Sequence, residues 1–140
     1  MPESRRRTRP LLMAPLYLVD GFNLLHAAVL TGRSRAEWRG AEAQRRVVEL
    51  AEKFGQGEVV VVFDERGSER AARTERVDVR FAPDADEYIV SECAALGSVR
   101  SIVVVSADRA LCDRAANRGA SRLSPWKFAE QCRGQVLGGT

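Results

Sequence analysis

The sequence predicts an α/β domain built on a mostly parallel sheet with helices on both of its faces. Short apolar runs that suit buried strands alternate along the chain with segments whose apolar residues recur at helical spacing. No repeat or linker divides the 140 residues, a length typical of one domain. We therefore expect an N-terminal tail over residues 1–14, followed by a single domain over residues 15–140.

The strand predictions rest on apolar runs and their endings. Leu16–Val19, Val59–Phe63 and Ser101–Val105 are continuous apolar or β-branched runs, as expected of parallel strands covered on both faces. Val77–Phe81 alternates apolar and charged residues, which indicates a half-exposed strand. A last short strand is expected over 120–123.

The helix predictions rest on capping residues and on apolar spacing. Ser34 and Glu37 form a capping box for a helix over 35–54, and Gly55 suits a C-terminal cap with positive φ. The other helices are expected over 23–30, from Asp84 and its capping-box partner Glu87 to Gly97, over 109–118 with a stop at Gly119, and from Ser124-Pro125 onward.

Charge and cysteine content bound the function. Residues 1–10 carry four arginines and one glutamate, and the remaining residues hold 18 basic and 18 acidic side chains, so the net charge of +3 comes from the tail. This tail is interpreted either as a solvated leader or as a phosphate-binding arm. Neither a signal peptide nor an apolar run of membrane-spanning length is present, so we expect a cytoplasmic protein without a membrane partner. Cys93, Cys112 and Cys132 lack metal-site spacing and are expected to be buried thiols.

Acidic residues follow the predicted strands. Asp20 and Asp64 end two buried strands, Asp108 follows a third, and Asp86 opens the helix after the half-exposed strand. Ligands of open parallel sheets bind outside the carboxyl ends of the strands, so these four acids are expected to converge. Clustered carboxylates repel one another unless a cation neutralises them, and Mg²⁺ or Mn²⁺ prefers such oxygen ligands. The pattern predicts a metal site that activates water against a phosphodiester.

Several of these residues have a structural alternative. Asp84 and Asp108 are suited to helix N-caps, and Asp86 in a first helical turn complements the helix dipole. Asn23 either contributes an amide to the site or starts a helix, and Ser106 either orients a phosphate or an acid or only ends a strand. His26, Trp38 and Trp126 are interpreted as structural residues.

Arginines lie beside the predicted site. The segment 65–76 directly follows Asp64 and includes Arg66, Arg70 and Arg73, while Arg109 follows Asp108. These arginines are candidates for contacts to an RNA backbone. The alternative is a solvated surface segment, because acids are interleaved with the arginines of the loop.

Four segments together resemble the YacP-like branch of the NYN domains, a PIN-like nuclease group. They are the segments Tyr17–Leu25, Val61–Asp64, Ala85–Ile89 and Val104–Arg109, and the resemblance covers about residues 16–128. It implies a PIN-like three-layer fold and a metal-dependent ribonuclease, with endonucleolytic cleavage as the first expectation. It also implies Asp20, Asp64, Asp86 and Asp108 as the catalytic and metal-binding acids, Asn23 as a polar helper, RNA as the substrate, and ribosome-linked RNA decay as the setting.

The chain departs from the family pattern in two places. Val90 stands where a glutamate is expected, and the loop after Asp64 is short. The alternative from another class is a noncatalytic RNA-binding or adaptor domain with the same fold. A dehalogenase-like phosphatase is disfavoured because Asp20 is not followed by a second Asp two residues later, and no phosphate-binding P-loop is present.

Overall fold

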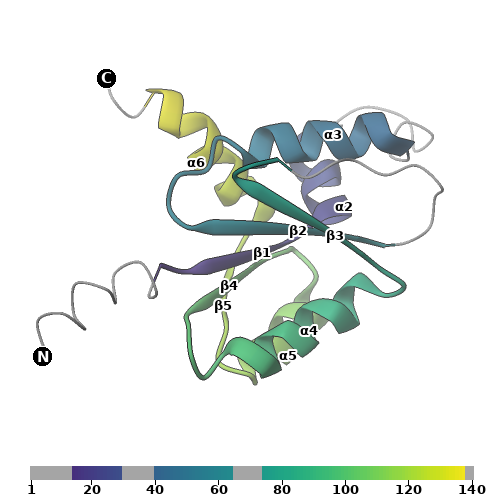
Figure 1. The fold of residues 1–140 in the computed structure, drawn as a ribbon, viewed down its shortest axis with the longest axis vertical. Coiled ribbons are helices and arrows are strands. Elements are labelled where there is room, and N and C mark those ends of the chain that lie inside the picture. Colours follow the sequence, from purple (N-terminus) through teal and green to yellow (C-terminus); the bar gives the residue numbers. More distant parts are fainter. Residues whose placement is uncertain (1–13, 30–39, 65–73, 138–140) are drawn as a thin grey trace, which may run out of the picture.

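Five parallel strands form the centre of the molecule (Figure 1). The computed structural model describes residues 14–29, 40–64 and 74–137. The strands are β1 (Leu16–Asp20), β2 (Glu58–Asp64), β3 (Val77–Ala82), β4 (Ile102–Val105) and β5 (Ser121–Leu123). Every neighbouring pair is parallel, and the order across the sheet is β3-β2-β1-β4-β5. The predicted parallel sheet is confirmed.

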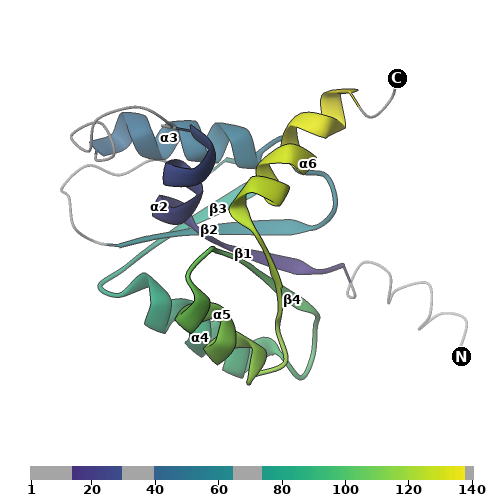
Figure 2. The same ribbon diagram turned by 180° about the vertical axis from the view of Figure 1, so that it is seen from behind.

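Helices cover both faces of this sheet. They are α2 (Gly21–Leu24), its π-helical continuation η1 (Leu25–Val29), α3 (Gly40–Ala51), α4 (Ala85–Leu96), α5 (Arg109–Ala116) and α6 (Pro125–Leu137). Figures 1 and 2 show α2, α3 and α6 on one face and α4 and α5 on the other. The predicted three-layer arrangement is therefore confirmed.

Alternating strand residues supply two hydrophobic cores. Val19, Val61 and Phe63 point into the layer of α3 and α6, where Tyr17 packs edge-on against Phe54 and Phe54 stacks on Phe128. The intervening strand residues, such as Leu18, Val62 and Val104, pack with α4 and α5. Strands buried on both faces explain why the sequence shows continuous apolar runs rather than alternation.

The chain reverses its direction across the sheet at β1. Successive connections lead from β1 outward to β2 and β3, and then back across to β4 and β5 on the other side. In an open parallel sheet, the crevice at such a switch point, beyond the carboxyl ends of the strands, is the usual ligand site. The fold therefore places the end of β1 at the most favourable position for a functional group.

Several predicted helix boundaries are confirmed, but the helix expected over 23–30 begins at Gly21 and the one expected over 109–118 ends at Ala116. The Asp84 side chain accepts a hydrogen bond from the Glu87 backbone N–H, and the Ser124 hydroxyl accepts one from the Lys127 N–H, as expected of N-caps. Gly119 ends the α5 region with φ +92°. The helix predicted over 35–54 is described only from residue 40, and it ends at Ala51 rather than Phe54.

The early end of α3 has a packing reason. The last residues form a tighter turn, with the Phe54 N–H bonded to the Ala51 carbonyl, and this turn delivers the Phe54 ring against Tyr17 at a centroid distance of 4.5 Å. The prediction of positive φ at Gly55 is wrong, because Gly119 alone has positive φ among the described residues. The predicted capping box at Ser34 and Glu37 lies outside the described residues.

The predictions for cysteine and tryptophan had different outcomes. All three cysteines are buried free thiols, as expected. Trp126, which the sequence indicated as a core or packing residue, is 58% exposed, because the buried face of α6 is formed by Phe128, Ala129 and Cys132. Trp38 lies outside the described residues. Within the described ranges, no helix has the length and apolar character that a membrane crossing requires.

Candidate active site at the carboxyl end of the sheet

Asp20 ends the central strand and is held there by a close backbone approach. The strand turns directly into α2 at Gly21, which is buried. A Cβ at Gly21 would lie 2.4 Å from the Phe63 ring, so a side chain at this position would displace the core of β2. The Asp-Gly pair thus lets α2 start immediately beside the sheet, and it leaves the half-buried Asp20 carboxylate at the strand end.

Ser106 connects two of the predicted acids. It is only 4% exposed, and its hydroxyl donates a hydrogen bond to Asp20 Oδ2 at 3.1 Å. The same hydroxyl oxygen accepts the backbone N–H of Asp108 at 3.0 Å. Of the two interpretations of Ser106 from the sequence, the structure favours the one in which it orients an acid.

The loop after β4 is fixed to α2 by Asn23. The Asn23 side-chain oxygen accepts the backbone N–H of Ala107 at 2.7 Å, which joins residues 84 positions apart in the sequence. Asp108 then caps α5 by accepting the Leu111 N–H at 3.1 Å. Asp108 therefore has the structural role considered from the sequence, and the contacts of Asn23 and Ser106 bring its loop beside Asp20.

Asp64 positions the start of α4. Its Oδ1 accepts the backbone N–H of Ala85 at 2.9 Å, across 21 residues of sequence. Ala85 precedes Asp86, which lies half-buried in the first turn of α4, after the N-cap Asp84. The carboxylate at the end of β2 thus fixes the backbone that carries the next acid.

The four acids influence one another electrostatically. Burial raises the pKa of Asp20 to about 6, and repulsion from Asp86 and Asp64 adds to this effect, while the Ser106 hydrogen bond opposes it. The pKa of Asp86 is also raised, first by burial and then by Asp108, Asp84 and Asp64. Acids from the ends of β1 and β2 and from the starts of α4 and α5 therefore interact at one edge of the sheet.

The donors at this edge fit a hard divalent cation in chemical type. They are carboxylate oxygens with a neighbouring hydroxyl and amide, and mutual repulsion between such carboxylates favours either a proton or a metal ion. Among the residues described, however, no three His, Cys, Asp or Glu side chains stand close enough to form a complete metal site. Water molecules would have to complete the coordination, which is the usual state of protein-bound Mg²⁺.

The remaining predicted site residues have different outcomes. Arg66, Arg70 and Arg73 lie outside the described residues. Arg109 is exposed in the first turn of α5. The residue that sequence reasoning missed is Arg114, which pairs with Glu87 at 2.6 Å and partly opposes the rise in the pKa of Asp86. Its one sequence signal was the spacing of Arg114 and Arg118 by four residues in a predicted helix.

Comparisons with known proteins agree with this architecture. The model of the YacP-like NYN domain matches residues 17–135. A crystal structure of Rae1 (YacP) from Bacillus subtilis superposes with a TM-score of 0.73 and 25% sequence identity, covering 88% of this chain and 76% of that one. A crystal structure of a point mutant of the same protein gives a TM-score of 0.72 at 25% identity, covering 89% and 78%. No curated protein sequence matches significantly.

The family match spans the whole sheet and every acid at its carboxyl edge. It begins in β1 before Asp20 and ends in α6, so it includes the acids, Ser106 and the helices that position them. The domain type named by that match is a PIN-like nuclease domain, in agreement with the resemblance found in the sequence. The chain therefore belongs to the YacP-like NYN domain family.

Proposed function

We propose that the protein is a metal-dependent ribonuclease that hydrolyses RNA phosphodiester bonds at the carboxyl edge of the sheet. The observation that carries this proposal is the state of Asp20. Its carboxylate ends the central strand, half-buried among other acids, and its pKa is raised to about 6. Such an acid costs stability in the absence of a cation, and perturbed acids of this kind cluster at functional sites.

Each acid has a proposed role that follows from its contacts. Asp20 and Asp86 are the principal ligands for Mg²⁺ or Mn²⁺, since both are half-buried and repel each other. Asp108 and Asp64 each use a carboxylate oxygen to hold backbone at the start of a helix, so they complete the site from its margin. The bound cation would supply an activated water and neutralise charge on the phosphodiester.

The neighbouring polar residues keep the acids in place. The Ser106 hydroxyl holds one oxygen of Asp20 and thereby sets the direction of the other. Asn23 holds the loop that carries Asp108. We include both as positioning residues, and Arg66, Arg70, Arg73 and Arg109 as candidate contacts to the RNA backbone. Cytoplasmic RNA decay, with a ribosome as a delivering partner, is the proposed setting.

The decisive experiment is cleavage of labelled RNA by the purified protein with Mg²⁺, with Mn²⁺ or with EDTA. Wild type should cleave with metal and not with EDTA. Asp20→Asn should lose more activity than the about 10–100-fold typical of residues that only support a metal ligand. Glu58→Gln is the matched control, because it neutralises an acid of the same sheet at the other end, and it should cleave like wild type.

The form of the substrate separates the remaining possibilities. A circular RNA is cut only by an endonuclease, so its linearisation supports endonucleolytic cleavage, and its persistence beside degraded linear RNA supports an exonuclease. RNA binding without metal-dependent cleavage would instead identify a noncatalytic RNA-binding domain. Equal cleavage by wild type and Asp20→Asn would overturn the assignment of the site.

A further inference from the structure

A groove of about 270 Å³ lies between α4 and α5 on the outer face of the molecule. It is lined by Val90 from α4, and by Arg114, Asn117 and Arg118 from α5 and the turn after it. Val90 is largely buried and forms an apolar floor, whereas the three polar residues are exposed. The groove thus offers two guanidinium groups and an amide above an apolar surface.

Helical spacing and one backbone contact determine the shape of this groove. Arg114 and the C-cap residue Asn117 are three residues apart, so they project from the same side of α5, and Arg118 follows in the turn after the helix. At the far end, a Cβ on Gly97 would lie 2.7 Å from the Arg118 carbonyl oxygen, which shows how closely the chain after α5 approaches the end of α4. The end of α4 and the turn after α5 are therefore in close contact at this end of the groove.

The near end of the groove adjoins the acidic site. Glu87, the residue after Asp86, pairs with Arg114 at 2.6 Å, and Val90 lies about one helical turn farther along α4. Asp86 and Arg114 also interact electrostatically, since each shifts the pKa of the other. A single-stranded RNA that extends from the acidic site along α4 and α5 would therefore enter this groove.

Charge determines which ligand the groove can accept. Both charged residues that line the groove are arginines, and the acids that act on Arg114, which are Glu87, Asp86 and Asp84, lie at its near end and are not part of the lining. Arginine forks match phosphate oxygens in geometry, and such contacts position an RNA strand without reading its sequence. An exposed ion pair contributes little energy, so a phosphate can replace Glu87 as the partner of Arg114.

We propose that the groove of Val90, Arg114, Asn117 and Arg118 binds the backbone phosphate of a nucleotide that flanks the cleaved bond in single-stranded RNA. This inference rests on the proposed function, because it gives the acidic site a substrate-positioning subsite. Glu87 acts against binding by competing with the phosphate for Arg114. The two roles predict effects of opposite sign on RNA affinity.

The test is anisotropy of a labelled single-stranded RNA of roughly 12 nucleotides, measured with EDTA over a range of salt concentrations. Arg114→Gln with Arg118→Gln should weaken binding about tenfold and reduce the log–log salt slope by about 1.4, for two phosphate contacts. Glu87→Gln should tighten binding. Arg118→Gln alone leaves the Glu87–Arg114 pair intact and should give about half of the change in slope.

The matched control is Arg45→Gln with Arg46→Gln. These exposed arginines pair with Glu42 on α3, on the opposite face of the sheet, and the double change removes the same charge. It should alter RNA affinity by less than about twofold, since only the long-range effect of the lost positive charge on RNA binding remains. Thermal unfolding of every variant confirms that the comparison is made between folded proteins.

The outcomes separate this inference from the proposed function. Equal loss of affinity in the two double variants would overturn the groove assignment. Weaker binding by Glu87→Gln would also overturn it, because it would mean that the pair only braces the helices. If wild type binds RNA through the groove but does not cleave it, the groove is supported and the ribonuclease proposal fails. If wild type cleaves RNA and the groove variants bind normally, only the groove is rejected.

Discussion

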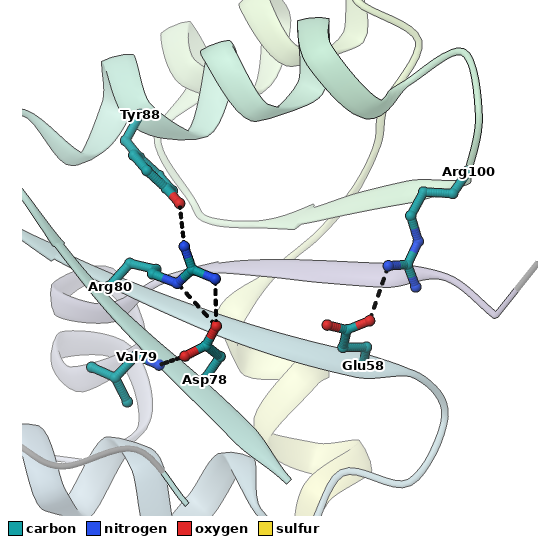
Figure 3. A network of polar contacts seen from close by, with 6 residues as sticks. All are labelled: Glu58, Asp78, Val79, Arg80, Tyr88 and Arg100. Atoms are coloured by element: carbon teal, nitrogen blue, oxygen red, sulfur yellow. Dashed lines mark hydrogen bonds and ion pairs between the residues drawn. The ribbon is translucent and has the colours of Figure 1, made fainter. Parts of the chain in front are cut away.

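The acidic residues at the two ends of the sheet have different interaction partners. Towards the amino end, Glu58 pairs with Arg100 at 2.9 Å, and Asp78 pairs with Arg80 at 2.6 Å (Figure 3). Arg80 also donates a hydrogen bond to the Tyr88 hydroxyl. At the carboxyl end, Asp20 accepts a hydrogen bond from a hydroxyl, and Asp64 and Asp108 accept bonds from backbone amides. Guanidinium groups pair with the acids at the amino end, whereas at the carboxyl end a hydroxyl and backbone amides donate to Asp20, Asp64 and Asp108, and Arg114 pairs with Glu87.

This difference separates residues that serve stability from residues that serve a site. A carboxylate that a guanidinium already neutralises has little remaining affinity for a cation. Burial and neighbouring carboxylates raise the pKa of a half-buried carboxylate, and its charge then destabilises the folded state at neutral pH. Proteins commonly sacrifice stability at functional sites in this way. The carboxyl end is therefore the end at which we propose a cation site.

The largest effect on the site, apart from changes to the acids themselves, is expected for Ser106→Ala. The change removes the donor to Asp20 and leaves the Asp108 N–H without its acceptor. Cleavage should fall about 10–100-fold, and the free energy of unfolding by about 1–2 kcal/mol. Steady-state cleavage and urea unfolding measure the two effects. Ser101→Ala, at an exposed position before β4, should change neither, and unchanged cleavage by folded Ser106→Ala protein would contradict the positioning role.

A contrast in stability is expected between neutralised acids at the two ends. Asp20→Asn should raise the free energy of unfolding by about 1–3 kcal/mol at pH 7.5 without metal, since its pKa is raised from 3.8 to about 6. Glu58→Gln should lower it by up to about 1 kcal/mol, because it breaks an exposed ion pair. Urea unfolding measures both. Destabilisation by Asp20→Asn would mean that its charge is compensated and that the contrast is wrong.

The pH dependence of stability should carry the signature of Asp20. The folded protein holds the Asp20 proton up to about pH 6 and the unfolded chain releases it near pH 3.8, so the folded state binds more protons between these values. Stability from this residue therefore falls as the pH rises through that window and is constant above it. The difference in unfolding free energy between wild type and Asp20→Asn isolates this contribution. A difference that does not vary between about pH 4 and pH 6 would reject the raised pKa.

The smallest effect is expected at the amino end. Arg100→Gln removes the pair with Glu58 and the hydrogen bond to the Ala14 carbonyl. The pair is partly exposed, so the free energy of unfolding should fall by about 1 kcal/mol or less, and RNA cleavage should not change. Cleavage assays on this variant are informative because a loss of activity there would show that the two ends are not independent.

The sequence predicted much of the fold because its signals are local. Strand runs that end in Asp, and caps such as Asp84 and Ser124, depend on residues a few positions apart. The sequence also predicted that acids would gather at one edge, since all parallel strands end on the same side. It could not predict the strand order that places β1 in the middle, because that order depends on pairing between distant segments.

The finer structure of the site depends on contacts that leave no local pattern. The bond from the Ala85 N–H to Asp64 spans 21 residues, and the bond from the Ser106 hydroxyl to Asp20 spans 86. Trp126 was interpreted as a core or packing residue because large apolar side chains are usually buried, whereas the rotation of α6 turns it outward. Arg114 resembled any surface arginine until α4 brought Glu87 beside it.

Titration calorimetry with Mn²⁺ at pH 7.5 tests the central claim most directly, using wild type, Asp20→Asn and Glu58→Gln. Wild type and Glu58→Gln should bind Mn²⁺ with equal affinity, and Asp20→Asn should bind at least about tenfold more weakly. Near pH 6, wild type should also release protons on binding, since Asp20 is then partly protonated and must lose its proton to ligate a metal. Equal Mn²⁺ affinity in all three proteins would contradict a metal site at the carboxyl end of the sheet.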